Sequence, residues 1–187
     1  MSEISDFIKY KSEIDELLQN VTRSLAGNLK TSFESEGQQW RIELQSDDNE
    51  ILIGHQGENL LAIQHILRTL FHTRHPENRT HFILDVSGYR TGRERFIAKM
   101  IRELVYKEVL QDGSQIIVKG LNSYERRLIH NSLVDYDGLE SSSIGQDENR
   151  RMIIRPTTGS MTRGIEDAKV IDIEKYEQEF RSQNPSF

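Results

Sequence analysis

The sequence contains no cysteine, which excludes disulfide bonds, thiolate zinc sites and a cysteine nucleophile. It also lacks an uninterrupted run of about 18 apolar residues, so we expect no membrane span. The first residues lack the charged-then-apolar pattern of a secretion signal, and together with the missing cysteine this favours a cytoplasmic protein. Hydrophobic residues make up 35% and charged residues 29% of the 187 positions, which suits one large or two small globular domains.

The net charge of −6 argues against nucleic-acid binding only until its distribution is considered. Residues 1–50 contain 5 basic and 11 acidic side chains, whereas residues 91–155 contain 11 basic and 10 acidic ones. All 6 histidines also lie between residues 51 and 155. Because binding to a polyanion depends on the local field and not on the total charge, the middle of the chain is a candidate nucleic-acid-binding region.

Hydrophobic periodicity and turn signals divide the chain into two successive α+β patterns. The first predicts helix, strand, strand, helix and strand over residues 3–27, 29–35, 38–46, 58–72 and 80–86. The second predicts helix, strand, helix, strand and strand over residues 89–110, 115–118, 121–133, 138–143 and 150–155. A break at Ser87 and Gly88 separates the two patterns, and we expect residues 157–187 to be partly ordered at best.

The first candidate binding site is the segment Gly54-His55-Gln56-Gly57, which lies between the apolar residues 51–53 and the predicted helix 58–72. Paired glycines allow a turn to bring backbone N–H groups close to a phosphate, and the following helix N-terminus adds partial positive charge. An ordinary strand-to-helix turn is the alternative, because G-x-x-G alone occurs in many loops. The apolar run before it and the amphipathic helix after it favour the binding interpretation.

The second candidate lies on the predicted helix 121–133. Arg126 and His130 are four residues apart and would therefore share one face of a helix. A guanidinium and an imidazole in this arrangement can contact one phosphate, and Arg127 could reach a second. In the structural alternative, His130 would bind a backbone carbonyl and Arg126 would pair with Glu125 or Asp135.

Other polar clusters shift the balance between these alternatives. Arg150, Arg151 and Arg155 on the predicted strand 150–155 extend the basic group and favour phosphate binding, with Arg150 and Arg151 as the candidate phosphate contacts. A basic stripe on the helix 89–110 is interpreted as a solvated face because glutamates interrupt it; it consists of Arg95, Lys99 and Arg102. The histidines around residues 72–81 are interpreted as surface residues and not as metal ligands; they are His72, His75 and His81. We find no serine-hydrolase, P-loop or zinc-protease motif, and we expect no enzymatic activity, metal or cofactor.

Three motifs, in order and at matching spacing, resemble the bacterial Jag family, in which a KH domain precedes an Arg-x-x-x-His (R-three-H) domain. They are L-I-G-x-x-G-E-x-L-x-A-x-Q at residues 52–64, L-D-V-x-G-Y-R at residues 84–90 and N-x-Y-E-R-R-x-I-H at residues 122–130. The resemblance extends over residues 10–156. It implies a type II KH-like domain (α-β-β-α-β) over residues 1–87, followed by an R-three-H α/β sandwich (α-β-α-β-β) over residues 88–156.

The resemblance further implies a cytoplasmic protein that binds RNA or other single-stranded nucleic acid. It also implies a role in post-transcriptional regulation or in the control of cell elongation and division, with a small KH protein or a second copy as a candidate partner. By position, residues 54–57 would form the KH loop, and Arg126 and His130 would be the signature pair of the second domain. A protein-interaction adaptor and a single-stranded DNA binder are the alternatives.

The sequence departs from the family pattern in two places. Family members often carry Arg or Lys between the two glycines, whereas this chain has His55 and Gln56. We therefore expect this loop to bind phosphate more weakly near neutral pH, and to bind it more strongly below about pH 6.5, where histidine becomes protonated. Many Jag proteins also begin with a separate basic domain, whereas this sequence opens with an acidic helix assigned to the KH unit, so functions of that domain are not carried over.

Overall fold

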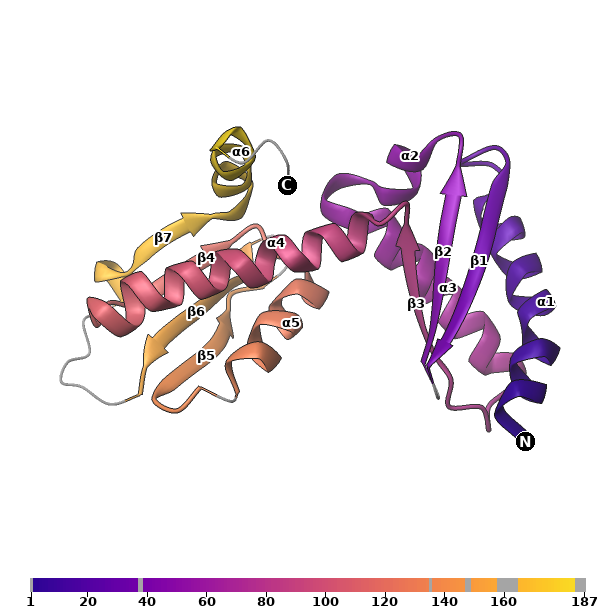
Figure 1. The fold of residues 1–187 in the computed structure, drawn as a ribbon, viewed down its shortest axis with the longest axis horizontal. Coiled ribbons are helices and arrows are strands. Elements are labelled where there is room, and N and C mark those ends of the chain that lie inside the picture. The colour runs from indigo at the N-terminus through magenta and orange to yellow at the C-terminus, as the bar shows by residue number, and fades with distance from the viewer. Residues whose placement is uncertain (1, 37–38, 135, 147–148, 158–164, 184–187) are drawn as a thin grey trace. The chain divides into compact units, whose positions relative to one another are not determined.

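The computed structural model describes residues 2–36, 39–134, 136–146, 149–157 and 165–183. Over these residues the chain has a mixed α+β structure that divides into two compact units, Met1–Gly92 and Arg93–Phe187. Each unit has its own sheet and its own hydrophobic core (Figure 1). The predicted boundary at residue 87 lies close to this division, which falls in the first turn of α4 (Tyr89–Leu104).

Unit 1 contains a three-stranded sheet with the strand order β1-β2-β3. Its elements are α1 (Ser2–Thr22), β1 (Leu29–Glu36), β2 (Gln39–Ser46), α2 (Asn49–Ile53), α3 (Glu58–Arg74) and β3 (His81–Val86). β1 and β2 are antiparallel, whereas β2 and β3 are parallel. Parallel strands need a long crossover connection. α2 and α3 form this connection between β2 and β3, and the glycine pair lies within it.

The core of unit 1 is built by alternation along the strands. Trp40, Ile42 and Leu44 of β2 are buried, because every second residue of a strand points to the same face. On that face the sheet packs against buried residues of α1 and α3, among them Leu18 and Leu67. This packing holds α3 against the sheet, and the glycine pair lies directly before the N-terminus of α3.

Unit 1 differs from the predicted pattern by one short helix, α2, which residues 51–53 help to form. A polar turn precedes it, in which the Ser46 backbone N–H donates to Asn49 Oδ1 at 2.8 Å and the Asp48 N–H donates to Ser46 Oγ at 2.9 Å. This turn starts a helix at Asn49, and the helix ends at Gly54. The glycine pair therefore joins two helices and does not follow a strand.

Unit 2 contains a four-stranded sheet with the strand order β5-β6-β4-β7. Its elements after α4 are a π-helical segment (Val105–Gln111), β4 (Ile116–Lys119), α5 (Ser123–Leu133), β5 (Leu139–Ile144), β6 (Arg151–Pro156), β7 (Lys169–Asp172) and α6 (Ile173–Gln183). β6 is antiparallel to β5 and β4, and β7 is parallel to β4. Among the described residues, no helix is both long and apolar enough to cross a membrane.

The described part of the C-terminal segment forms regular secondary structure. Within residues 165–183, β7 extends the sheet and α6 buries Ile173 and Phe180 in the core of unit 2. The apolar residues at positions 173, 176 and 180 of α6 lie at helical spacing, so one face of this helix is covered by the core. The second unit thus extends past the predicted limit at residue 156. Thr158, Gly159 and Ser160, at the start of the predicted tail, lie outside the described residues.

Candidate nucleic-acid interface

The glycine pair adopts backbone angles that other residues rarely adopt. Gly54 has φ 69° and ψ −175°, and Gly57 has φ 80°. A Cβ atom on Gly54 would lie 2.5 Å from Cγ of Asn59, whose side-chain amide donates to the carbonyl of Ile51 at 2.8 Å. Gln56 also has a positive φ of 50°. The turn therefore requires glycine at its first position for both backbone and packing reasons.

The second glycine is buried against an aromatic ring that sequence reasoning did not assign to the site. A Cβ atom on Gly57 would lie 3.1 Å from Cε1 of Tyr89. His55 is exposed and Gln56 is half-buried, so the two side chains between the glycines differ in their access to solvent. The sequence feature that could have assigned Tyr89 to the site was its position in the motif at residues 84–90, directly after β3.

A buried polar network joins the residues on either side of Tyr89 to α3. The guanidinium of Arg90 donates to Gln64 Oε1 at 2.7 Å and to the carbonyl of Leu84 at 3.1 Å. Gln64 Oε1 also accepts the backbone N–H of Leu84 at 3.0 Å, which joins α3 to the outer edge of β3. Asp85 accepts the backbone N–H of Arg90 at 2.8 Å and thereby fixes the start of α4. The motif at residues 84–90 thus connects the glycine turn, α3 and β3.

In unit 2 the predicted basic residues gather around one pocket of about 350 Å³. The pocket lies between α5, β5 and the start of β6, which are neighbours in Figure 1. Its lining residues are Ser123, Arg126, Arg127, His130, Ser141, Ser142, Ser143, Arg150 and Met152. The three adjacent serines were not predicted, although pairing of the two predicted hairpin strands would have placed them beside the basic residues of the second strand.

Local capping starts the helix that carries three of these basic residues. Asn122 and Glu125 form a capping box, in which the Glu125 N–H donates to Asn122 Oδ1 and the Asn122 N–H donates to Glu125 Oε2, both at 2.9 Å. Arg126 and His130 follow at helical spacing, and both line the pocket. His130 Nδ1 lies 2.8 Å from the hydroxyl of Ser141, and not against a backbone carbonyl as the structural alternative supposed.

Arg150 lines the pocket, whereas Arg151 does not belong to its lining residues. Arg150 and Met152 face the pocket. The intervening Arg151 points to the other face, because successive side chains of a strand point to opposite faces of the sheet. Arg151 is exposed, and its Cα pairs with that of Ile144 in β5. The structure therefore brings together four of the five basic residues predicted for this unit.

The charge of the pocket is not neutralised from within. The guanidinium of Arg126 donates to the carbonyl of Leu121 and does not pair with Glu125; Asp135, the other partner in the structural alternative, lies outside the described residues. Burial lowers the pKa of Arg126 below its ordinary value, and the positive charge of Arg150 lowers it further, while Glu125 opposes both. Within the part of the chain that the structure describes, no carboxylate oxygen lies within 4.0 Å of Arg126, Arg127 or Arg150. The pocket can therefore accept an anion.

Glu125 is engaged by a buried ion pair that sequence reasoning missed. Arg93 Nε donates to Glu125 Oε1 at 2.7 Å, and the same guanidinium also contacts the carboxylate of Glu177 on α6. The side chains of Arg93 and Glu125 are 8% and 2% exposed. The C-terminal helix is thus linked through Arg93 to the first turn of α5, directly beside Arg126.

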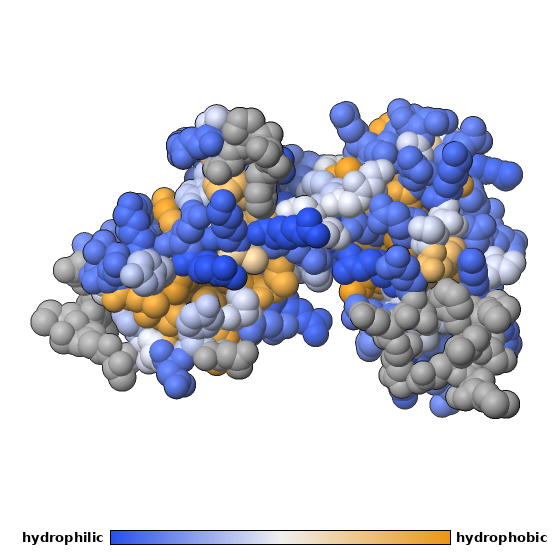
Figure 2. Space-filling view, in the orientation of Figure 1, coloured by the Kyte–Doolittle hydropathy of each residue, from blue (hydrophilic) through white to orange (hydrophobic). Residues whose placement is uncertain are grey.

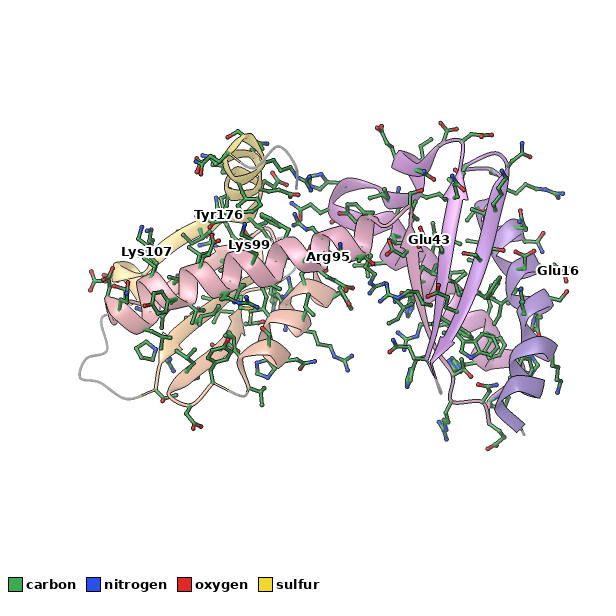
Figure 3. The ribbon with its side chains drawn as sticks, in the orientation of Figure 1. Glu16, Glu43, Arg95, Lys99, Lys107 and Tyr176 are labelled. Carbon is green, nitrogen blue, oxygen red and sulfur yellow. The ribbon has the colours of Figure 1, made fainter. Side chains whose placement is uncertain are left out.

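One residue of the other basic stripe, Lys99, and one of the histidines, His75, have local partners. Figure 3 labels Arg95 and Lys99 along α4, and Figure 2 shows many hydrophilic residues along this helix. The ammonium group of Lys99 lies 4.5 Å from the ring centroid of Phe180, which is a packing role. His75 Nε2 lies 2.7 Å from Glu13 Oε2. Among the described residues, no group of His, Asp and Glu could hold a metal ion.

The pocket lies in a segment that matches a known domain family. Residues 95–156 match the family model of the R-three-H domain. This range includes α5, β5 and β6 and therefore every lining residue of the pocket. The second unit accordingly contains an R-three-H domain.

The chain is also similar to several bacterial proteins named RNA-binding protein KhpB. It is 26% identical over 131 residues to the protein of Clostridium symbiosum, which covers 70% of this chain and 58% of that protein. It is 29% identical over 104 residues to the protein of Lactiplantibacillus plantarum, covering 56% of this chain and 32% of the relative. The match to the Streptococcus pneumoniae protein is 28% over 116 residues, covering 60% and 34%. The chain thus spans less than two thirds of these relatives' lengths.

Proposed function

We propose that this chain binds single-stranded RNA, with one contact in each unit. The observation that carries the proposal is the pocket of Arg126, Arg127, His130 and Arg150 within the R-three-H domain, whose arginines have no carboxylate partner among the described residues. The names of the similar proteins support RNA as the ligand. Arginine is suited to phosphate because its planar guanidinium can donate two parallel hydrogen bonds.

Unit 1 would act as a KH domain. The support is its G-x-x-G turn between two helices, its mixed three-stranded sheet and the positive φ angles of Gly54 and Gly57. In KH domains the G-x-x-G loop clamps the backbone of about four nucleotides. Gly57 leaves room for the ring of Tyr89, while the exposed His55 would lie beside the path of the strand.

The pocket is tested by comparing two single-arginine variants on the same hairpin. Arg150→Gln removes a pocket charge, whereas Arg155→Gln removes an exposed charge that pairs with Glu140 at 2.8 Å. Binding of a labelled oligoribonucleotide is measured by fluorescence anisotropy at several salt concentrations. Arg150→Gln should weaken binding and reduce the salt slope by about 0.7, the value for one phosphate contact on a single strand. Equal behaviour of the two variants would remove the pocket from the proposal.

The turn in unit 1 is tested by Gly57→Asp, which puts a negative charge and a side chain against Tyr89. Gly113→Asp is the control, because Gly113 also has a positive φ of 64° but no atom lies within 4 Å of the place that a Cβ atom would take there. The chain has 1 tryptophan, Trp40, which is buried in unit 1, so its fluorescence reports whether that unit remains folded. RNA binding should be lost in Gly57→Asp and retained in Gly113→Asp; equal retention would exclude the turn as a contact.

The cellular setting of this activity follows from the family resemblance. We propose that the protein works in the cytoplasm, in post-transcriptional regulation or in the control of cell elongation and division. Crosslinking in cells followed by sequencing of the bound nucleic acid tests the setting, because transcripts should be recovered. Recovery of DNA in their place would contradict the choice of RNA.

A further inference from the structure

A second cationic cluster lies in unit 1, toward the end of α3 that is remote from the glycine pair. It consists of Arg68 and His72 on α3, Arg79 in the following loop, and His81 at the start of β3. We call these four residues the α3-terminal patch. They include histidines that the sequence pattern assigned to the surface, and neither the glycine turn nor the R-three-H pocket uses them.

Two contacts define the geometry of the α3-terminal patch. Arg68 Nη2 lies 3.2 Å from Nδ1 of His81, so the imidazole nitrogen accepts a hydrogen bond from the guanidinium. His72 Nδ1 lies 3.2 Å from the carbonyl of Asn78 and must donate its proton to it. Basic side chains from the helix and from the strand therefore meet at this edge of the sheet.

The surroundings of the patch are positively charged. Burial lowers the pKa of His72 first, and the basic neighbours that lower it further are Arg68, His81, Arg79 and His75. The nearby carboxylate of Glu13 is already engaged by Arg74 at 3.1 Å and by His75 at 2.7 Å. Across the described residues, no carboxylate oxygen lies within 4.0 Å of the patch. Such a cluster favours an external anion.

The patch and the glycine turn border the same seam between α3 and β3. At one end, Tyr89, which follows β3, packs against Gly57. In the middle, Gln64 of α3 accepts the backbone N–H of Leu84 in β3. At the other end, Arg68 contacts His81. A strand laid along this seam would meet both ends.

We infer that the α3-terminal patch binds a backbone phosphate of the same RNA strand that contacts the glycine turn. This inference rests on the proposed function. The stretch of α3 from Gly57 to Arg68 corresponds to about 16 Å at a rise of about 1.5 Å per residue. A stacked strand covers that distance with about five phosphates at about 3.4 Å each, so an oligonucleotide of about ten residues can reach both. RNA is favoured over an acidic protein because the patch continues the seam that starts at the turn.

The test compares Arg68→Gln with Arg74→Gln, a control on the same helix with the same change in charge. Arg74 is 56% exposed and paired with Glu13, so it lies outside the patch. Binding of an RNA of about ten nucleotides is measured at several salt concentrations, and Trp40 fluorescence verifies folding of unit 1. Arg68→Gln should reduce the salt slope by about 0.7, Arg74→Gln should leave it unchanged, and Arg68→Lys should restore it.

The outcomes separate the inference from the proposed function. If the wild-type chain binds RNA and the Arg68→Gln and Arg74→Gln variants behave alike, the patch does not contact RNA and the proposed function stands. If an acidic peptide competes for Arg68 while RNA does not depend on this residue, the patch is a protein-binding surface and the inference is overturned. If the wild-type chain binds no RNA at any salt concentration, both statements fail together.

Discussion

Replacing Arg93 by methionine should destabilise unit 2 by about 3 kcal/mol, since removing one partner of a buried ion pair costs about 3–5 kcal/mol. The change leaves the carboxylate of Glu125, 2% exposed, without its cationic partner. We place the cost at the lower end for two reasons. Glu125 keeps its hydrogen bond from the Asn122 N–H, and Glu177 is 21% exposed and can be hydrated.

Urea unfolding followed by two signals measures this cost. Far-UV circular dichroism reports both units, whereas fluorescence of Trp40 reports unit 1 alone. A chain with two units need not unfold in one step, so the two signals must be fitted separately. In Arg93→Met the circular-dichroism transition assigned to unit 2 should move to lower urea, and the fluorescence transition should stay in place.

The matched control is Arg181→Met on α6. Arg181 pairs with the same Glu177 at 2.9 Å, but its side chain is 53% exposed and the pair has i,i+4 spacing. Such exposed helix pairs contribute about 0.3–0.5 kcal/mol. If Arg93→Met is no more destabilising than Arg181→Met, the link between α6 and α5 does not stabilise the unit, and the reasoning from burial is refuted.

Four further substitutions test three separate features. Gly54→Ala should lower stability by about 1–3 kcal/mol because of its positive φ, and Asn59→Ala should relieve the steric part of this loss, as measured by Trp40 fluorescence in urea. Asn122→Ala should cost about 1 kcal/mol through loss of the helix cap, measured by circular dichroism; no change would mean that the capping box is dispensable. Burial and then the charge of Asp85 raise the pKa of Glu43, which is labelled in Figure 3. Ionised Glu43 is therefore disfavoured in the folded state, and Glu43→Gln should raise the melting temperature at pH 7 but not below pH 4.5, its ordinary pKa; an equal gain at both pH values would contradict this.

Much of the fold follows from local sequence patterns. Alternation at Trp40, Ile42 and Leu44 predicts β2, and the apolar spacing around Leu67 predicts α3. The helix α2 was not predicted because three apolar residues fit a strand as well as a helix, and side-chain hydrogen bonds of the preceding turn decide between them. The order of the C-terminal segment depends on a core formed by distant residues, which a local reading of residues 157–187 does not include.

The candidate site was predictable where it depends on helical spacing. Arg126 and His130 are four residues apart, and this alone places them on one face. The pairing of β5 with β6 decides that Arg150 and not Arg151 faces the pocket, and this depends on strand register. The ion pair between Arg93 and Glu125 joins residues distant in the chain, so no local pattern could reveal it.

The most direct test of the central claim is equilibrium binding of a short single-stranded RNA by the purified chain over a range of salt concentrations. Two phosphate contacts, one at the glycine turn and one at the R-three-H pocket, predict that the logarithm of the association constant falls with the logarithm of salt concentration. The slope should be about −1.4 or steeper. Absence of binding in dilute buffer, or binding that does not change with salt, would contradict the account.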